Sequence, residues 1–230
     1  RLTVIDLSEH AQQPMVDREL GLTLVFNGCI YNYRELRQEL EGRGYRFTSS
    51  GDTEGVLKAF HAWGQEAWQR LHGMFAVVVH ERDTGRVTLA RDRFGIKPLY
   101  LAQTRGGLRF GSSLPALICD PEVDRSIDLM ALDHYLSWHA VVPPPLTLLK
   151  GVRKLPPGSS LSIDGEGEGT LHTWWQLSVQ ADPDLAALPV REREDMVEQA
   201  LRTAVQRRAL ADVPVGVLLS GGVDSSLIVA

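Results

Sequence analysis

The chain has 230 residues, of which 43% are hydrophobic and 23% are charged, and its net charge is −5. These values are ordinary for a globular protein with a sizeable core, and the acidic balance gives no reason to expect nucleic acid or an anionic membrane as a partner. No apolar run approaches the roughly 20 residues of a membrane helix, and the first residues show no signal-peptide pattern. Two distant cysteines do not make a disulfide framework, which favours a reducing, cytoplasmic compartment.

Short strands and helices are expected to alternate in the first part of the chain. The segment LTVIDL (2–7) has strand character, and LTLVFNG (22–28) predicts a buried strand that ends in a turn at Asn-Gly. Apolar residues at helical spacing predict helices over 33–44 and 53–64, each ended by glycine. Two β-branched runs around Asp-Thr-Gly predict a hairpin over 74–92.

The following segments are shorter and less regular. GLRFGSS (107–113) predicts a strand, and DLMALDHYL (128–136) predicts a short helix. The proline-rich stretch 141–163 predicts a surface path that closes into strands, and DGEGEGT (164–170) predicts a hairpin tip.

The polar, proline-containing stretch SVQADPDLAALPVRERED predicts a domain boundary. A helix with an apolar stripe is expected over 193–210, and VPVGVLLSGGVDSSLIVA (213–230) then predicts a strand, a glycine loop and a helix. The expected organisation is a β-rich α+β domain over 1–178, a linker over 179–191, and the first helix, strand and loop of an α/β domain over 192–230. Because the chain lacks an initiator methionine and ends in an apolar run, we expect it to be a fragment of a longer protein.

The glycine loop has the features of a phosphate-binding site. An expected strand, Val215–Leu219, leads into Ser220-Gly221-Gly222, and a helix is expected to begin near Asp224 and Ser225. Glycines let backbone N–H groups approach an anion, and a helix N-terminus adds positive partial charge. No lysine follows the glycines, so the loop is not a Walker A motif. The simpler interpretation is a strand–helix turn in which Asp224 or Ser225 caps the helix.

Several separated stretches carry a family resemblance. In chain order they are RLTVIDL, FNGCIYNYRELR, SGDTEGVLKAF, LHGMFAVVV, ARDRFGIKPLY and LLSGGVDSS. Together they resemble the class II glutamine amidotransferases of the asparagine synthetase branch, and the last resembles the pyrophosphate loop of N-type ATP pyrophosphatases. The resemblance covers essentially the whole chain. It implies an Ntn-hydrolase-like αββα sandwich, truncated at its N-terminus, followed by the start of an adenine-nucleotide α-hydrolase-like domain.

Cys29 follows an Asn-Gly pair that could form an oxyanion hole, so one hypothesis is that Cys29 is the catalytic nucleophile. A reactive cysteine needs a base or a lowered pKa, and no histidine lies near Cys29 in the sequence. The resemblance implies a different nucleophile, the N-terminal cysteine of the mature protein, upstream of Arg1. The position of Cys29 is usually glutamate in that family. Cys29 is therefore expected not to be the nucleophile, and Cys119 is expected to be a small hydrophobic residue.

The resemblance also implies how glutamine is held. The side chain of Asn27 and the N–H of Gly28 would form the oxyanion hole. Arg1 would bind the α-carboxylate of glutamine and Asp52 its α-ammonium. The implied glutamine-binding set is Arg1, Leu2, Val4, Asn27, Gly28, Cys29 and Asp52. Simpler readings are a turn at Asn27-Gly28 and a helix N-cap at Asp52.

For the second domain the resemblance implies ATP and Mg²⁺ as cofactors. The implied ATP-binding residues are Leu218, Ser220, Gly221, Gly222, Asp224 and Ser225, and Asp224 is the candidate ligand for magnesium with pyrophosphate. The stretch ARDRFGIKPLY is expected to be a structural loop near the domain interface and the ammonia path, with a solvated hairpin end as the alternative. The seven histidines are scattered, and no zinc site is expected.

The implied reaction hydrolyses L-glutamine and transfers the ammonia to an adenylated carboxylate acceptor, by default aspartate. The stretches NGCIYNY, WHAVVPPP and LKGVRKLPPG leave a second acceptor open, the small peptide N-acetylglutaminylglutamine. A third reading, from another class, is a non-catalytic binding or assembly module that kept the fold. The oligomeric state is open, with a homodimer among the options. Because the nucleophile is expected upstream, these residues alone are not expected to hydrolyse glutamine.

Overall fold

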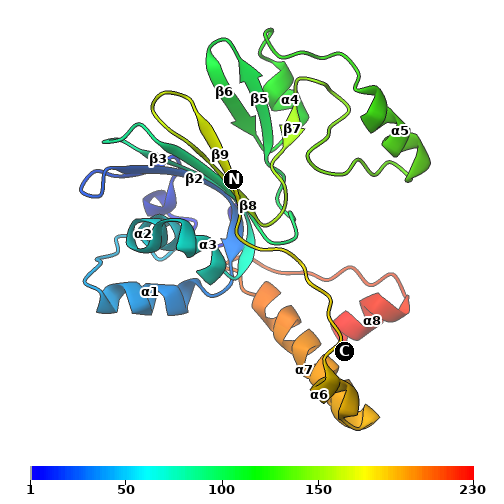
Figure 1. Cartoon of the computed structure of the whole chain (residues 1–230). Coiled ribbons are helices and arrows are strands. Elements are labelled where there is room, and N and C mark those ends of the chain that lie inside the picture. Colours follow the sequence, from blue (N-terminus) through cyan, green and yellow to red (C-terminus); the bar gives the residue numbers. More distant parts are fainter. Residues whose placement is uncertain (1) are drawn as a thin grey trace.

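The structure, a computed structural model, describes residues 2–230. Residues 2–175 form a layered sandwich (Figure 1). An antiparallel six-stranded sheet has the order β1-β2-β3-β4-β8-β9. Its strands are β1 (Met15–Asp17), β2 (Leu22–Ile30), β3 (Gly73–Glu81), β4 (Val87–Arg91), β8 (Ser159–Ile163) and β9 (Gly169–Thr173). A three-stranded antiparallel sheet has the order β6-β5-β7, with β5 (Tyr100–Thr104), β6 (Gly107–Gly111) and β7 (Arg153–Lys154).

Helices cover the outer face of each sheet. The large sheet packs against α1 (Tyr33–Gly42), α2 (Asp52–Trp63) and α3 (Ala67–Arg70), and the small sheet packs against α4 (Leu114–Ile118). The remaining elements of this part are α5 (Leu129–Ser137) and the 3₁₀ turns η1 (Glu9–Ala11) and η2 (Gly64–Glu66). The order of layers is therefore helix, sheet, sheet, helix, which confirms the expected αββα sandwich.

Strand β3 shows why its sequence forms the centre of the sandwich. Phe75, Val77 and Val79 point to the helices, whereas Ala76 and Val78 point to the small sheet. Successive side chains of a strand alternate between faces, so a continuous apolar run is expected where both faces are buried. The predicted hairpin over 74–92, the helices over 33–44 and 53–64, and the strand at 107–113 are confirmed within a few residues.

Two predictions in the first part are wrong. Residues 2–7 form no strand, because Asp6 has a φ of 48° and the backbone of Val4 bonds to Asp212 instead of to a strand. The strand at 22–28 does not end in a turn at Asn27-Gly28, because pairing with β3 continues to Ile30. The simpler reading of Asn27-Gly28 as a turn is therefore also wrong.

The second part of the chain forms α6 (Pro183–Ala187), α7 (Val190–Arg208) and α8 (Val223–Val229). The predicted helix over 193–210 is confirmed, and α6 lies inside the expected linker. The predicted strand Val215–Leu219 is wrong: this segment is exposed and has no strand assignment. A strand is stable only when another strand pairs with it, and none does so among residues 2–230. In the described part of the chain, no helix has the length and apolar character that crossing a bilayer requires.

Candidate active site

The end of β2 approaches β3 so closely that only glycine fits at position 28. A Cβ atom there would lie 2.2 Å from the carbonyl oxygen of Met74 and 2.8 Å from the Cα of Phe75. Both atoms belong to the backbone of β3, which cannot move aside without breaking the sheet. The glycine of the Asn-Gly pair is therefore required by a close approach of two strands.

The N–H of Gly28 points to the edge of β2 that faces away from β3. Tyr31 N–H bonds to His72 O just beyond the strand, so by the antiparallel alternation the N–H groups of even-numbered residues face the other way. On that edge Phe26 N–H donates to Gln13 Oε1 at 2.7 Å, and Ile30 N–H donates to Asp52 Oδ2 at 2.9 Å. The Gly28 N–H lies between these two, beyond the residues of β2 that pair with β1.

Asn27 lies on the opposite face of β2 from Phe26, toward the small sheet. Its Nδ2 donates to the hydroxyl oxygen of Ser112 at 3.1 Å, and Ser112 is the residue after β6. The side chain is half-buried, so one amide hydrogen is bound within the sandwich while the group still reaches solvent. A side-chain amide and a backbone N–H thus lie on adjacent residues at one end of the strand.

Cys29 is buried, with 3% of its surface exposed. Burial raises the pKa of the Cys29 thiol to about 12, and the charge of Asp52 acts in the same direction. A thiol with such a pKa is protonated near neutral pH and is a poor nucleophile. The raised pKa gives no support to Cys29 as a nucleophile, and its role in the site stays a prediction. Cys119, expected to behave as a small hydrophobic residue, is exposed.

Asp52 is the first residue of α2 and is itself buried. The N-cap of α2 is Gly51, so the simpler reading of Asp52 as the cap is wrong. Its carboxylate accepts the hydrogen bond from Ile30 N–H, which fixes α2 beside the end of β2. The predicted residues Asn27, Gly28, Cys29 and Asp52 therefore gather at one place in the fold.

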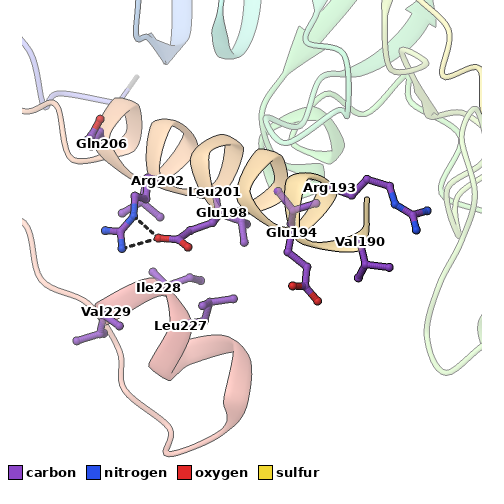
Figure 2. Close-up of a pocket in the computed structure, with 13 residues that line it drawn as sticks. Val190, Arg193, Glu194, Glu198, Leu201, Arg202, Gln206, Leu227, Ile228 and Val229 are labelled. Carbon is purple, nitrogen blue, oxygen red and sulfur yellow. Dashed lines mark hydrogen bonds and ion pairs between the residues drawn. The ribbon is translucent and has the colours of Figure 1, made fainter. Parts of the chain in front are cut away.

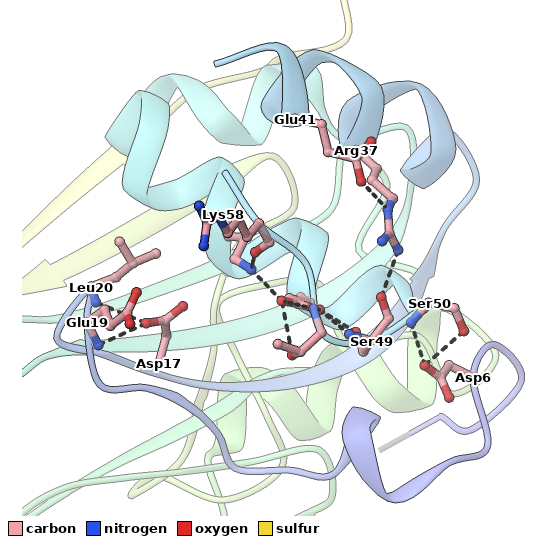
Figure 3. Close-up of polar contacts among 12 residues, drawn as sticks. Asp6, Asp17, Glu19, Leu20, Arg37, Glu41, Ser49, Ser50 and Lys58 are labelled. Carbon is pink, nitrogen blue, oxygen red and sulfur yellow. Dashed lines mark hydrogen bonds and ion pairs between the residues drawn. The ribbon is translucent and has the colours of Figure 1, made fainter. Parts of the chain in front are cut away.

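Carboxylates hold the loop that precedes Asp52 (Figure 3). Glu54 accepts the N–H groups of Thr48 and Ser49, and it forms a buried ion pair with Lys58. Burial raises the pKa of Glu54, but the hydrogen bonds from Lys58, Ser49 and Thr48 outweigh it, so the net shift of the pKa is downward. The loop that leads to Asp52 is thus bound through its backbone.

The N-terminal residues lie against the same site. Leu2 and Val4 are partly buried and pack against the core between α1, α2 and the large sheet. Asp6 accepts hydrogen bonds from Ser50 N–H at 2.8 Å and Ser50 Oγ at 3.0 Å, two residues before Asp52. The predicted glutamine-binding residue Arg1 lies outside the described residues.

The stretch ARDRFGIKPLY is a bound loop rather than a solvated hairpin end. Asp92, 1% exposed, accepts four backbone N–H groups, and Arg91 donates to three carbonyl oxygens. Phe94 and Ile96 extend from the loop and line a cavity of about 1070 Å³ together with α7. Burial lowers the pKa of His72, another residue of that cavity, with a further contribution from nearby arginines. The loop therefore lies where the two parts of the chain meet.

The glycine loop lies apart from these residues. The N-cap of α8 is Gly222, and Asp224 is the second residue of the helix, so the reading of Asp224 or Ser225 as the cap is wrong. Ser225 Oγ donates to Gly222 O at 3.1 Å and lies 3.0 Å from Ser220 Oγ. Gly221 has a φ of 80°, a conformation that glycine adopts readily. Leu218 is 94% exposed.

The apolar stripe of α7 divides between two cavities. A groove of about 730 Å³ is lined by Val197, Leu201 and Val205 of α7 and by Leu227 and Ile228 of α8. Figure 2 shows Leu201 on α7 opposite Leu227 and Ile228 on α8. The neighbouring Met196, Ala200 and Ala204 line the cavity next to Phe94 and Ile96. Within residues 2–230, no group of three or more histidine, cysteine or acidic residues could hold a metal ion.

Asp6, Ser112 and Asp212 are among the residues at the site that were not predicted from the sequence. Each contacts the site from a segment far away in the chain, as with Asp6 and Asp212, which are 206 positions apart. Only Asp6 lies in a stretch that the resemblance had singled out. These contacts join residues far apart in the sequence, so the spacing of residue types along the chain could not predict them.

Comparison with known proteins agrees with this geometry. Residues 1–175 match the family model described as "Glutamine amidotransferase domain", and residues 196–230 match the one described as "Asparagine synthase". A solved structure described as the allosteric regulatory enzyme of purine biosynthesis has a TM-score of 0.50 at 22% identity. It covers 72% of this chain and 31% of its own, and it supports the fold alone. The class that the fold and the site define is therefore a glutamine amidotransferase.

The chain belongs to the glutamine amidotransferase domain family, as the match over residues 1–175 shows. It is similar to asparagine synthetase [glutamine-hydrolyzing] 1 of Bacillus subtilis, with 38% identity over all of this chain and 35% of that protein. It is also similar to asparagine synthetase B [glutamine-hydrolyzing] of Escherichia coli, with 31% identity over all of this chain and 35% of that protein. The chain thus spans about a third of the length of these relatives.

Proposed function

We propose that the chain is the glutamine-hydrolysing part, with the start of the ATP-dependent part, of an enzyme that forms an amide from a carboxylate. The observation that carries this proposal is that two hydrogen-bond donors, the side-chain amide of Asn27 and the edge-facing N–H of Gly28, lie on adjacent residues at the end of β2. Attack on the carboxamide of glutamine places negative charge on its oxygen, and two fixed donors stabilise that charge. The protonated thiol of Cys29 is not assigned as the nucleophile.

Binding of glutamine is assigned to the residues around this pair. Asp52, held between β2 and α2, takes the α-ammonium group, and Arg1 takes the α-carboxylate. Leu2, Val4 and Cys29 complete the walls. Cys29 supplies no charge at neutral pH because its thiol is protonated, so the ammonium group relies on Asp52.

The second half-reaction is assigned to the glycine loop. Ser220, Gly221 and Gly222 offer short polar groups and backbone N–H groups to the phosphates of ATP, and Leu218 and Ser225 flank them. Asp224 is the single acidic residue from 213 to 230 and lies in the first turn of α8. One carboxylate fits Mg²⁺, which keeps several waters and is otherwise bound by phosphate oxygens. ATP would activate the acceptor as an acyl-adenylate.

Aspartate is the acceptor that the similarity to asparagine synthetases favours, and a small peptide is the alternative. Amide formation measured in the full-length protein with aspartate and with N-acetylglutaminylglutamine, each supplied with ATP and glutamine, separates the two. Hydrolysis of glutamine without turnover of either acceptor would point to another carboxylate.

The test of the glutamine site is Asn27→Ala in the full-length protein. Loss of one donor to the oxyanion should lower glutamine-dependent turnover about a hundred- to a thousandfold, while synthesis from free ammonia persists. Asn32→Ala is the matched control, because among the described residues the side chain of Asn32 bonds only to the backbone of Arg70 and His72. It should affect stability without distinguishing the nitrogen sources. Equal loss with glutamine and ammonia in Asn27→Ala would make Asn27 structural.

The test of the ATP site is Asp224→Asn. Asp224 does not cap α8, so the change should leave the melting temperature nearly unaltered while it abolishes ATP–pyrophosphate exchange. Glutamine hydrolysis without ATP should persist. Normal exchange in a well-folded variant would remove Asp224 from the nucleotide site.

A further inference from the structure

Asp212 joins the two parts of the chain through a pair of reciprocal contacts. Its N–H donates to Val4 O at 2.7 Å, and its Oδ2 accepts the N–H of Asp6 at 2.9 Å. Asp212 lies between the end of α7 at Arg208 and the start of the glycine loop at Ser220. A single residue of the second part thus binds two backbone groups of the N-terminal segment.

Asp6 is held in a conformation that it would not adopt by default. Its φ of 48° lies in the left-handed region, which costs a non-glycine residue on the order of 1 kcal/mol and persists only where neighbours enforce it. Asp6 is buried, with 6% of its surface exposed. Asp6 Oδ1 accepts Ser8 N–H at 3.0 Å and Ser8 Oγ at 2.5 Å. The backbone bond to Asp212 is one of the contacts that hold this conformation.

The carboxylate of Asp6 also binds the loop that precedes Asp52. Asp6 Oδ2 accepts both the N–H and the hydroxyl of Ser50 (Figure 3). A Cβ on the following residue, Gly51, would lie only 3.1 Å from the Asp6 Cβ, so the two segments are in close contact. Asp52 comes next and binds Ile30 N–H at the end of β2. Hydrogen bonds therefore connect Asp212 to both segments that flank the end of β2.

We infer that Asp212 is a positioning residue for the glutamine site: it holds the segment Val4–Asp6, and through Asp6 the loop before Asp52, in the geometry that binds glutamine. The inference rests on the proposed function. Asp212 touches no substrate and takes no part in bond making. Its effect should therefore appear in glutamine binding and not in the ATP-dependent step, although it belongs to the part of the chain that carries the glycine loop.

The kinetic test uses Asp212→Ala in the full-length protein. Loss of the bond to Asp6 should raise the KM for glutamine about tenfold with little change in kcat, and synthesis from ammonia should stay within about twofold of the unaltered enzyme. Asp212→Asn keeps an acceptor oxygen and should restore the KM. Asp195→Ala is the matched control, because Asp195 lies on α7 beside the same interface and its side chain has no hydrogen bond or ion pair among residues 2–230.

A second measurement reports on the contact without relying on activity. Hydrogen–deuterium exchange of peptides covering 2–10 and 46–53 should be faster in Asp212→Ala than in the unaltered protein, and unchanged in Asp195→Ala. An unchanged KM for glutamine, or an equal loss of ammonia-dependent synthesis, would overturn the inference. If the unaltered full-length protein hydrolyses no glutamine, the proposed function fails. The exchange result then decides by itself whether Asp212 orders these two segments.

Discussion

Removal of the Asp92 carboxylate should unfold much of the bound loop between β4 and β5. The two oxygens accept N–H groups from Phe75 at 3.1 Å, Lys97 at 3.0 Å, Phe94 at 3.1 Å and Ile96 at 3.0 Å. The bond from Phe75 is fully buried and the other three are partly buried. A buried N–H left without an acceptor, as for Phe75, costs about 1–3 kcal/mol, and each of the other three lost bonds costs about 0.5–1.5 kcal/mol. Asp92→Ala should therefore lose roughly 3–5 kcal/mol of stability.

Urea unfolding followed by tryptophan fluorescence measures this loss of stability. The loss corresponds to a fall in melting temperature of about 6–20 °C for a chain of this size. Asp92→Asn should also lower the stability of the protein, because the NH₂ group of asparagine is a donor and would face backbone N–H groups that need an acceptor. Asp83→Asn is the matched control, since Asp83 lies in an exposed turn with a surface ion pair to Arg82, and its effect should stay within about 0.5 kcal/mol. A loss below about 1 kcal/mol in Asp92→Ala would refute the reasoning.

Three further outcomes can be checked on the same protein. Gly28→Ala should destabilise by about 3 kcal/mol or more, because its Cβ would meet a carbonyl of β3 at 2.2 Å, whereas Gly55→Ala inside α2 meets nothing within 4 Å and should stabilise by about 0.5–1 kcal/mol in urea unfolding. At pH 8 a thiol reagent should label Cys119 in the folded protein and Cys29 only after unfolding, as intact mass would show; labelling of both in the folded state would contradict the burial. Burial raises the pKa of Asp6, but hydrogen bonds from serine side chains and backbone outweigh it and lower the pKa to about 2 from 3.8. The stabilising contribution of the Asp6 carboxylate is therefore complete only above about pH 5 and is lost as the pH falls through about 2. Asp6→Asn should lose less stability than the unaltered protein between pH 5 and pH 3.

The regular elements of the first part could be predicted because their signals are local. Helical spacing of apolar residues located α1 and α2, and two β-branched runs around a short turn located β3 and β4. The pairing of the small sheet and its place against the large sheet could not be derived in this way. Strand partners are chosen by contacts between residues far apart in the chain, so periodicity alone does not determine them.

The failures have the same origin. Residues 2–7 have the composition of a strand, but the acceptor that binds their backbone is Asp212, more than 200 positions away. Val215–Leu219 has the composition of a buried strand, yet no strand among the described residues pairs with it. At the site, Asn27, Gly28 and Asp52 were indicated by family resemblance. Ser112 was not, because its contact with Asn27 crosses from one sheet to the other.

Around the candidate site, acidic side chains accept the backbone N–H groups of loops that no neighbouring strand binds. Asp6, Asp52, Glu54 and Asp92 are all buried, and each accepts at least one backbone N–H from a segment outside its own turn or helix. A carboxylate offers about four acceptor sites in a small volume, so it can fix an irregular loop where no second strand is available. Such charge-assisted bonds are also stronger than neutral ones, which suits loops that must hold their shape beside a reacting group.

This arrangement explains why acidic residues in these loops were easy to misread from the sequence. From the sequence, Asp52 looks like a helix cap and Asp6 like the end of a strand. In the structure, each carboxylate instead accepts a backbone N–H from another segment. A cap acts on its own helix, whereas these carboxylates connect the N-terminal segment, the loop before α2 and the end of β2. The geometry of the site therefore depends on three separate segments being bound together, and Asp212 adds a fourth from the part of the chain that carries the glycine loop.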